Sequence, residues 1–233
     1  TPLARAVTFT GSIIPASNTY RLGGHAISQS VNSAASTLVF GRSNILTGTA
    51  GLSMSFGGLT LIGTNDYTGG TVINGNAISV PVLGIGSNAA FGTGLITLAG
   101  TRQVNFGAVN GDHSVSNNIA FDGAATLGWL AGADNTNDSI LANTNQGTLT
   151  YLGEVNLGGA NRTITGRPRG TLFLGDITGS SAGVNYTQTV GGYFSFLTTS
   201  ANGGTPKTYS GTTSLGDNAV LVIDSESSLG TGG

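Results

Sequence analysis

Few residues of this sequence can carry out chemistry, and the most suggestive group is Asp112-His113-Ser114. An acid, an imidazole and a hydroxyl make up a nucleophilic triad, but triad members meet in space from separated positions. Neighbours on a strand also point to opposite faces. We therefore interpret these residues as a polar loop after the turn Asn110-Gly111. The other histidine, His25, lies in a glycine-rich stretch without an acid nearby, and we expect it to be exposed.

The acidic residues also give no local sign of a catalytic or metal site. They stand singly in turns, so no pair has the spacing that glycoside hydrolysis would suggest. Residues 134–138 have the oxygen density of a calcium loop, but they lack the central glycine, and Asn145 stands where the loop needs glutamate. The absence of cysteine excludes disulfides, thiolate zinc sites and a cysteine nucleophile. We predict no catalytic residue, no metal and no cofactor, hence a protein that is not an enzyme.

The basic residues indicate no nucleic-acid partner. The net charge is −2, and only Arg162, Arg167 and Arg169 form a cluster, whereas nucleic-acid binding needs a clustered basic face. We interpret the cluster as a solvated loop, and binding of an anionic glycan or of a neighbouring subunit's acids is the open alternative. The apolar runs are too short to span a membrane, so we expect no transmembrane segment.

The composition specifies the kind of fold that positions these residues. Of 233 residues, 40 are Gly, 32 Thr, 23 Ser and 20 Asn, and only 8% are charged, against about 25% in a typical soluble domain. The shortage of Glu, Lys, Arg and Gln argues against a helical bundle. Since 38% of the residues are hydrophobic, ordinary disorder is also excluded. The sequence predicts a folded β protein.

Short segments that alternate between apolar and small polar residues occur along the whole chain. Thr on one face and Leu, Val or Phe on the other suit a half-buried strand, and Asn-Gly and Gly-Gly pairs suit the turns between strands. The predicted strands include residues 7–10, 52–56, 59–62, 95–98, 149–152, 171–174 and 219–223.

Two segments, 57–100 and 207–233, are similar to each other. Tyr67-Thr68-Gly69 aligns with Tyr209-Ser210-Gly211, and 91–94 (FGTG) aligns with 229–232 (LGTG). Repeats of this kind are typical of solenoids. We therefore predict one solenoid domain over residues 1–233.

The motif of the first copy is GGLTLxGxNxYTGGTxIxG, followed by a strand and then by [LF]GTGxITL. It resembles the β-strand repeat associated with the passenger domains of autotransporters, which are secreted or surface-anchored bacterial proteins. The resemblance is nearly continuous over 57–100 and partial over 209–233. It implies a right-handed parallel β-helix that is exported to the outside of a bacterium or to its cell surface, by a route that stays open.

Physical reasoning also favours a parallel β-helix. Coils stack about 4.8 Å apart, with apolar residues inside, Thr, Ser or Asn outside and Gly or Asn at the corners. Leu61 and Ile73 are expected to point inward, and Thr60 to face out. The alternative is an antiparallel β-sandwich or jelly roll, which also has short, evenly spaced strands. Polysaccharide lyases share the β-helix fold, but they resemble one another in calcium-binding acids and a basic catalytic residue, and Lys207 is the only lysine here.

Two functions compete. One is a structural subunit of an extracellular or cell-surface assembly, and the other is an adhesin or glycan-binding module. Long polar faces with few charges favour contact between copies, because charges would have to be desolvated at a cost. We expect the partner to be the protein itself, in an end-to-end filament, with a glycan or the cell surface as further possible partners.

The predicted subunit contacts lie near the two ends of the sequence. Val7 and Phe9 alternate in the first strand, which has no preceding coil to pair with. In the second repeat, Leu229 and Gly230 belong to the motif after which the first repeat continues into the strand 95–100. Uncapped solenoid ends promote association. The alternative interpretation is a trimmed fragment whose next coil lies beyond residue 233.

Overall fold

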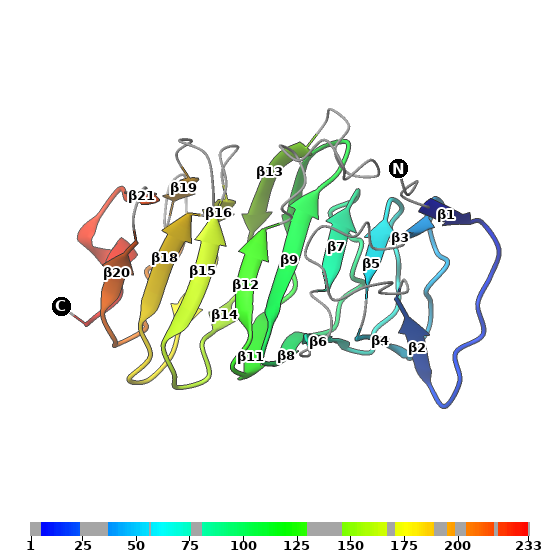
Figure 1. Cartoon of the computed structure of the whole chain (residues 1–233), viewed down its shortest axis with the longest axis horizontal. Coiled ribbons are helices and arrows are strands. Elements are labelled where there is room, and N and C mark those ends of the chain that lie inside the picture. The colour runs from blue at the N-terminus through cyan, green and yellow to red at the C-terminus, as the bar shows by residue number, and fades with distance from the viewer. Residues whose placement is uncertain are drawn as a thin grey trace, which may run out of the picture.

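Short strands alternate with corners throughout the computed structural model of the protein. The structure describes residues 6–23, 37–55, 57–75, 81–129, 146–166, 171–188, 195–198, 204–216 and 219–232. In these residues there are twenty-one strands and one short 3-10 helix, η1 (Glu226–Leu229) (Figure 1). The predictions for His25, for residues 134–138, and for Arg167 and Arg169 lie outside the described residues.

The strands form three sheets. The nine-stranded sheet contains, in spatial order, β1 (Ala6–Phe9), β3 (Thr37–Phe40), β5 (Gly58–Leu61), β7 (Val82–Ile85), β9 (Gln103–Ala108), β12 (Thr126–Trp129), β15 (Arg162–Gly166), β18 (Val184–Gln188) and β20 (Thr213–Leu215). The seven-stranded sheet contains β2 (Thr19–Leu22), β4 (Gly51–Met54), β6 (Thr71–Gly75), β8 (Ile96–Gly100), β11 (Ile119–Gly123), β14 (Val155–Asn156) and β17 (Ile177–Thr178). The five-stranded sheet contains β10 (Gly111–Val115), β13 (Gln146–Tyr151), β16 (Thr171–Phe173), β19 (Ser195–Thr198) and β21 (Ala219–Val222).

Within each sheet, neighbouring strands come from successive coils and pair in parallel, as in β3–β5–β7–β9. Thr37 pairs with Gly58, Gly58 with Val82 and Val82 with Asn105, so these coils contain 21, 24 and 23 residues. The coils follow one another along the long axis of the molecule, from β1 at one end to β20 and β21 at the other (Figure 1). The predicted parallel β-helix is confirmed, and the antiparallel sandwich is not the fold.

The core lies between the sheets and consists of side chains that stack from coil to coil. Four aromatic rings form a continuous stack, with centroids 5.9, 6.4 and 4.8 Å apart in the order Phe91, Phe106, Tyr151 and Phe173. Each ring is at most 2% exposed. Every coil except those at the ends therefore buries its inner residues against two neighbours, and burial of apolar area is the main stabilising contribution.

The predicted burial of Leu61 and Ile73 is confirmed, and the predicted exposure of Thr60 is wrong. Leu61 and Ile73 are 1% and 0% exposed. Thr60 alternates with Leu61, but it is only 2% exposed, and its hydroxyl has no hydrogen-bond partner among the described residues. The outer face of β5 is therefore covered rather than open to water.

The two repeat copies form the same corner. The hydroxyl of Tyr67 lies 2.5 Å from Oγ1 of Thr71, and the hydroxyl of Tyr209 lies 2.5 Å from Oγ1 of Thr213. However, Thr71 begins β6 in the seven-stranded sheet, whereas Thr213 begins β20 in the nine-stranded sheet. The motif thus specifies a corner and the strand after it, and it can be placed on different faces of the solenoid.

In both copies a glycine of the next turn packs directly on the tyrosine. The backbone N–H of Thr93, next to Gly92, donates to the carbonyl of Tyr67 at 3.2 Å, and the N–H of Thr231, next to Gly230, donates to that of Tyr209 at 2.9 Å. Both glycines have positive φ, and a Cβ on either would overlap the tyrosine carbonyl oxygen beneath it. The glycine of the FGTG and LGTG segments is required by this close approach.

Gly92→Ala is expected to destabilise the protein by about 1–3 kcal/mol more than Gly48→Ala. Both glycines have left-handed φ, +57° and +75°, so the two variants share the conformational cost. A Cβ on Gly48 meets nothing within 4 Å, whereas one on Gly92 meets the backbone of Tyr67. Chemical denaturation of the two variants measures the difference, and equal losses would contradict the close stacking of the corners.

Candidate interface at the ends of the solenoid

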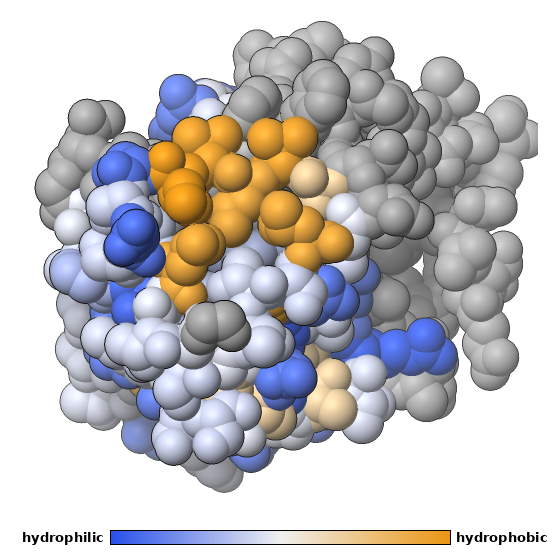
Figure 2. Space-filling model, turned by 90° about the vertical axis from the view of Figure 1, so that its left-hand side faces the viewer, coloured by the Kyte–Doolittle hydropathy of each residue, from blue (hydrophilic) through white to orange (hydrophobic). Residues whose placement is uncertain are grey.

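The C-terminal end of the solenoid exposes an apolar surface. Figure 2 looks at this end and shows a contiguous orange area on it. The large apolar side chains exposed in the last described coil are Leu215, Val222 and Ile223, with exposed fractions of 55%, 39% and 40%. An apolar patch of this kind on a chain with so polar a surface makes this end the candidate site of interaction.

Leu215 is exposed because no described coil stacks on it. Ile164 pairs with Tyr186, and Tyr186 pairs with Leu215 along the nine-stranded sheet. The first two side chains are 1% exposed, so Leu215 belongs to an inner row. Strand β20 pairs with β18 on one side, and among the described residues no strand pairs with its other edge. The last described coil thus exposes an inner-row side chain on a strand edge that no other described strand pairs with.

The first described coil, at the N-terminal end, also exposes an inner-row residue on an unpaired strand edge. Strand β1 pairs only with β3 among the described strands. Val7 lies in register with Leu38 and, through it, with the buried Leu59, yet Val7 is 60% exposed. Phe9 is half-buried against Phe40, with ring centroids 5.6 Å apart. Val7 and Phe9 are therefore inner-row residues that no described coil covers on their outer side.

The other two predicted contact residues lie at the C-terminal end, near but not in the edge strands. Leu229 ends η1, and Gly230 packs on Tyr209. Both line a hollow of about 320 Å³, together with Thr213, Glu226, Thr231 and Gly232. The edge residues Leu215 and Val222 were missed. Val222 lies in the predicted strand 219–223, but alternation does not show that a strand lies at an edge, and no strand was predicted around Leu215.

Asp112, His113 and Ser114 lie in strand β10, so the predicted loop is wrong. Oδ1 of Asp112 accepts the backbone N–H of Thr148 at 2.7 Å. The imidazole of His113 lies 2.9 Å from the carbonyl of Val109 through Nε2 and 3.2 Å from Oδ1 of Asn88 through Nδ1. The acid and the imidazole are therefore bonded to other groups, and both tie neighbouring segments of the solenoid together.

The sequence suggested that Arg162 belongs to a solvated loop, but its side chain is buried. It is only 7% exposed, and its guanidinium lies over the ring of Phe121, 5.2 Å from the centroid. Nε donates to the carbonyl of Leu157 at 2.8 Å, and Nη1 donates to that of Gly123. Burial lowers the pKa of Arg162. These contacts fasten a corner, so Arg162 is not presented to an anionic glycan.

Lys207 is buried as well. It is 2% exposed, and Nζ donates to the carbonyls of Gly175 at 2.5 Å, Thr205 at 3.0 Å and Leu174 at 3.4 Å. Burial lowers the pKa of Lys207 to about 8, and the carboxylate of Asp176 partly opposes this shift. The ammonium group thus satisfies three backbone acceptors, which is a structural role that its position in a turn did not reveal.

Within the described ranges, no group of three or more His, Cys, Asp or Glu side chains has an arrangement that could hold a metal ion. In the same residues no helix is long and apolar enough to cross a membrane. Comparison with protein-family models, with curated proteins and with solved structures finds no match to this chain.

Proposed function

We propose that the protein is a non-enzymatic structural subunit of an extracellular or bacterial cell-surface assembly, in which copies stack end to end into a filament. The observation that carries the proposal is that, among the described residues, inner-row side chains are exposed on the unpaired edges of the first and last strands of the nine-stranded sheet, Val7 on β1 and Leu215 on β20.

An open strand edge presents N–H and C=O groups that a further strand can pair with. If β1 of a second copy pairs with β20, the nine-stranded sheet continues from one copy into the next. The register is restricted, because a slip of one residue would turn the apolar side chains outward. An inward register places Val7 or Phe9 over Leu215. The two surfaces differ, so the contact is heterologous and does not close, which produces a filament.

The proposed location rests on the resemblance of residues 57–100 to the repeats of secreted and surface-anchored bacterial passengers. The small number of charges agrees with close contact between copies, because little charge has to be desolvated.

Neutral polar substitutions at the ends test the proposal. We expect Leu215→Gln and Val7→Gln each to raise the concentration needed for assembly roughly tenfold or more, since each removes the burial of an apolar side chain at the contact. Val72→Gln is the matched control, because Val72 is 41% exposed on the side of the solenoid. Electron microscopy and sedimentation velocity provide the readouts. Monomers at every concentration of the unmodified chain, or equal assembly of all variants, would refute the proposal.

The adhesin function has one observation in its favour. The outer face of the seven-stranded sheet carries a row of side chains in register over successive coils, none of them fully buried: Ser53, Val72, Thr97, Ala120, Asn156 and Thr178. Such a row offers a straight, neutral track for an extended glycan. Dispersed monomers that bind to a glycan array would favour this function over the structural one.

A further inference from the structure

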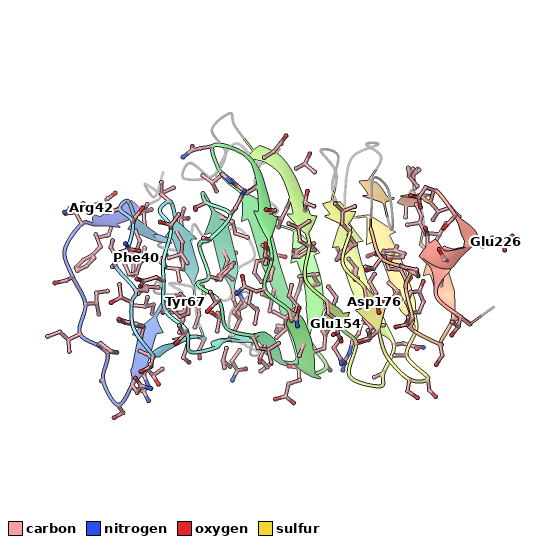
Figure 3. All side chains as sticks on the ribbon, turned by 180° about the vertical axis from the view of Figure 1, so that it is seen from behind. Phe40, Arg42, Tyr67, Glu154, Asp176 and Glu226 are labelled. Carbon is pink, nitrogen blue, oxygen red and sulfur yellow. The ribbon has the colours of Figure 1, made fainter. Side chains whose placement is uncertain are left out.

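The charges of this chain are unevenly distributed along its length. Residues 1–65 contain three arginines and no acidic residue, and residues 204–233 contain three acidic residues and one basic residue, the buried Lys207. The arginines are Arg5, Arg21 and Arg42, and the acids are Asp217, Asp224 and Glu226. Because the coils follow the order of the chain, this asymmetry becomes an asymmetry in space. Figure 3 shows Arg42 and Glu226 at opposite ends of the molecule.

We infer that the basic N-terminal end of one copy binds the acidic C-terminal end of the next. This inference rests on the proposed function and specifies its partner, a second copy in head-to-tail orientation, and its control by ionic strength.

At the N-terminal end, both described arginines are exposed and belong to the outermost coils. Nη1 of Arg42 donates to the carbonyl of Thr10 at 3.3 Å, so the guanidinium reaches from the second coil to the first. Nη1 of Arg21 donates to the carbonyl of Ala16 at 3.3 Å within the first coil. The positive charge is therefore concentrated where a preceding copy would dock.

At the C-terminal end, Glu226 is exposed at the start of η1 and borders the hollow that Leu229 and Gly230 line. Asp224 lies two residues earlier and accepts a hydrogen bond from the hydroxyl of Ser228 at 2.9 Å. Negative charge and apolar surface thus lie on the same end, and the opposite end offers positive charge and apolar surface.

This arrangement selects the orientation of the partner. Contact between two C-terminal ends or two N-terminal ends brings like charges together, which is unfavourable at short range. Contact between unlike ends brings opposite charges together, and their attraction is screened over about 8 Å at physiological ionic strength. The apolar surfaces provide attraction in either case, and the charges decide which ends meet.

Charge reversal at one end tests the inference. Arg42→Glu and Glu226→Arg are each expected to raise the concentration needed for assembly roughly tenfold at low salt, with a smaller effect at high salt. Asp122→Arg is the control for Glu226→Arg, because Asp122 is exposed on β11 in the middle of the solenoid and its replacement changes the charge by the same amount and in the same direction. The inference is overturned if the end variants assemble like the unmodified chain.

A chain with both ends fully reversed, in which Arg5, Arg21 and Arg42 are replaced by Glu and Asp217, Asp224 and Glu226 by Arg, provides a test that misfolding cannot imitate. The net charge of each end then changes sign, so the two ends match each other again and the chain is expected to assemble with itself. Mixed with the unmodified chain and labelled with a different dye, it is expected to form separate filaments, and random mixing would contradict the inference. If Leu215→Gln blocks assembly while charge reversals have no effect, only this inference fails. If the unmodified chain never assembles, the proposed function fails with it.

Discussion

Ile73→Asp is expected to unfold the solenoid, whereas Val72→Asp, one residue earlier in β6, is expected to leave it folded. Ile73 is 0% exposed and lies in register between Met54 and Leu98, which are both fully buried. Loss of the isoleucine side chain costs about 2–5 kcal/mol, and a buried unpaired carboxylate costs several more. The sum approaches the whole stability of a typical domain, about 5–15 kcal/mol.

Val72 points to the opposite face and is 41% exposed, so its replacement removes little packing. Circular dichroism during heating compares the two variants. Equal melting temperatures would show that the inner and outer faces of β6 are assigned incorrectly. Thr60→Lys, which the sequence suggests is harmless, is now expected to destabilise the protein, because Thr60 is only 2% exposed.

The strands were predictable because a strand in a solenoid is specified locally. Alternation of apolar and small polar residues predicted β4, β8 and β21 to within two residues of the observed bounds. Coverage of an outer face depends on segments distant in sequence. Thr60 therefore looks like any exposed threonine in the sequence, although the structure buries it.

The two buried cations could not be predicted for a related reason. Arg162 and Lys207 are stabilised mainly by backbone carbonyls at corners, and carbonyl groups leave no trace in a residue pattern. The corner motif shows the same limit. Its tyrosine and threonine positions in both copies follow from the sequence, but the different sheets that Thr71 and Thr213 enter follow only from the path of the whole chain.

For the N-terminal end, the alternation of the first strand is enough to predict Val7 and Phe9 as contact residues. The sequence does not indicate Leu215, because edge position is a property of the assembled sheet. The charge asymmetry is visible in the sequence, but it gains meaning only when the coils are known to follow chain order along one axis.

The tyrosines of the interior make the protein sensitive to alkali. Burial raises the pKa of Tyr67, Tyr151 and Tyr186, and to a lesser extent that of Tyr209. In the unfolded chain a tyrosine loses its proton near pH 10. Above that pH the unfolded state binds fewer protons than the folded state, so stability falls as the pH rises. Lys207 has the opposite effect on stability. Between about pH 8 and the pKa of lysine in the unfolded chain, the unfolded state binds more protons than the folded state, so this residue makes stability rise with pH.

We therefore expect the free energy of unfolding to decrease above pH 10 by as much as about 1.4 kcal/mol per pH unit for each buried tyrosine. For the three tyrosines with the largest shifts, Tyr67, Tyr151 and Tyr186, the loss at about pH 11 sums to about 4 kcal/mol, a large part of the stability of a typical domain, about 5–15 kcal/mol. Urea denaturation at a series of pH values measures this loss of stability, and phenolate absorbance should appear together with unfolding.

Tyr186→Phe is the informative variant, because the Tyr186 hydroxyl is buried without a hydrogen-bond partner among the described residues. Removal of this hydroxyl should change the free energy of unfolding little at neutral pH. At about pH 11 the variant should lose about 1.4 kcal/mol less of its free energy of unfolding than the unmodified chain. A stability that stays constant from about pH 9 to about pH 11 would show that these tyrosines ionise as freely in the folded protein as in the unfolded chain.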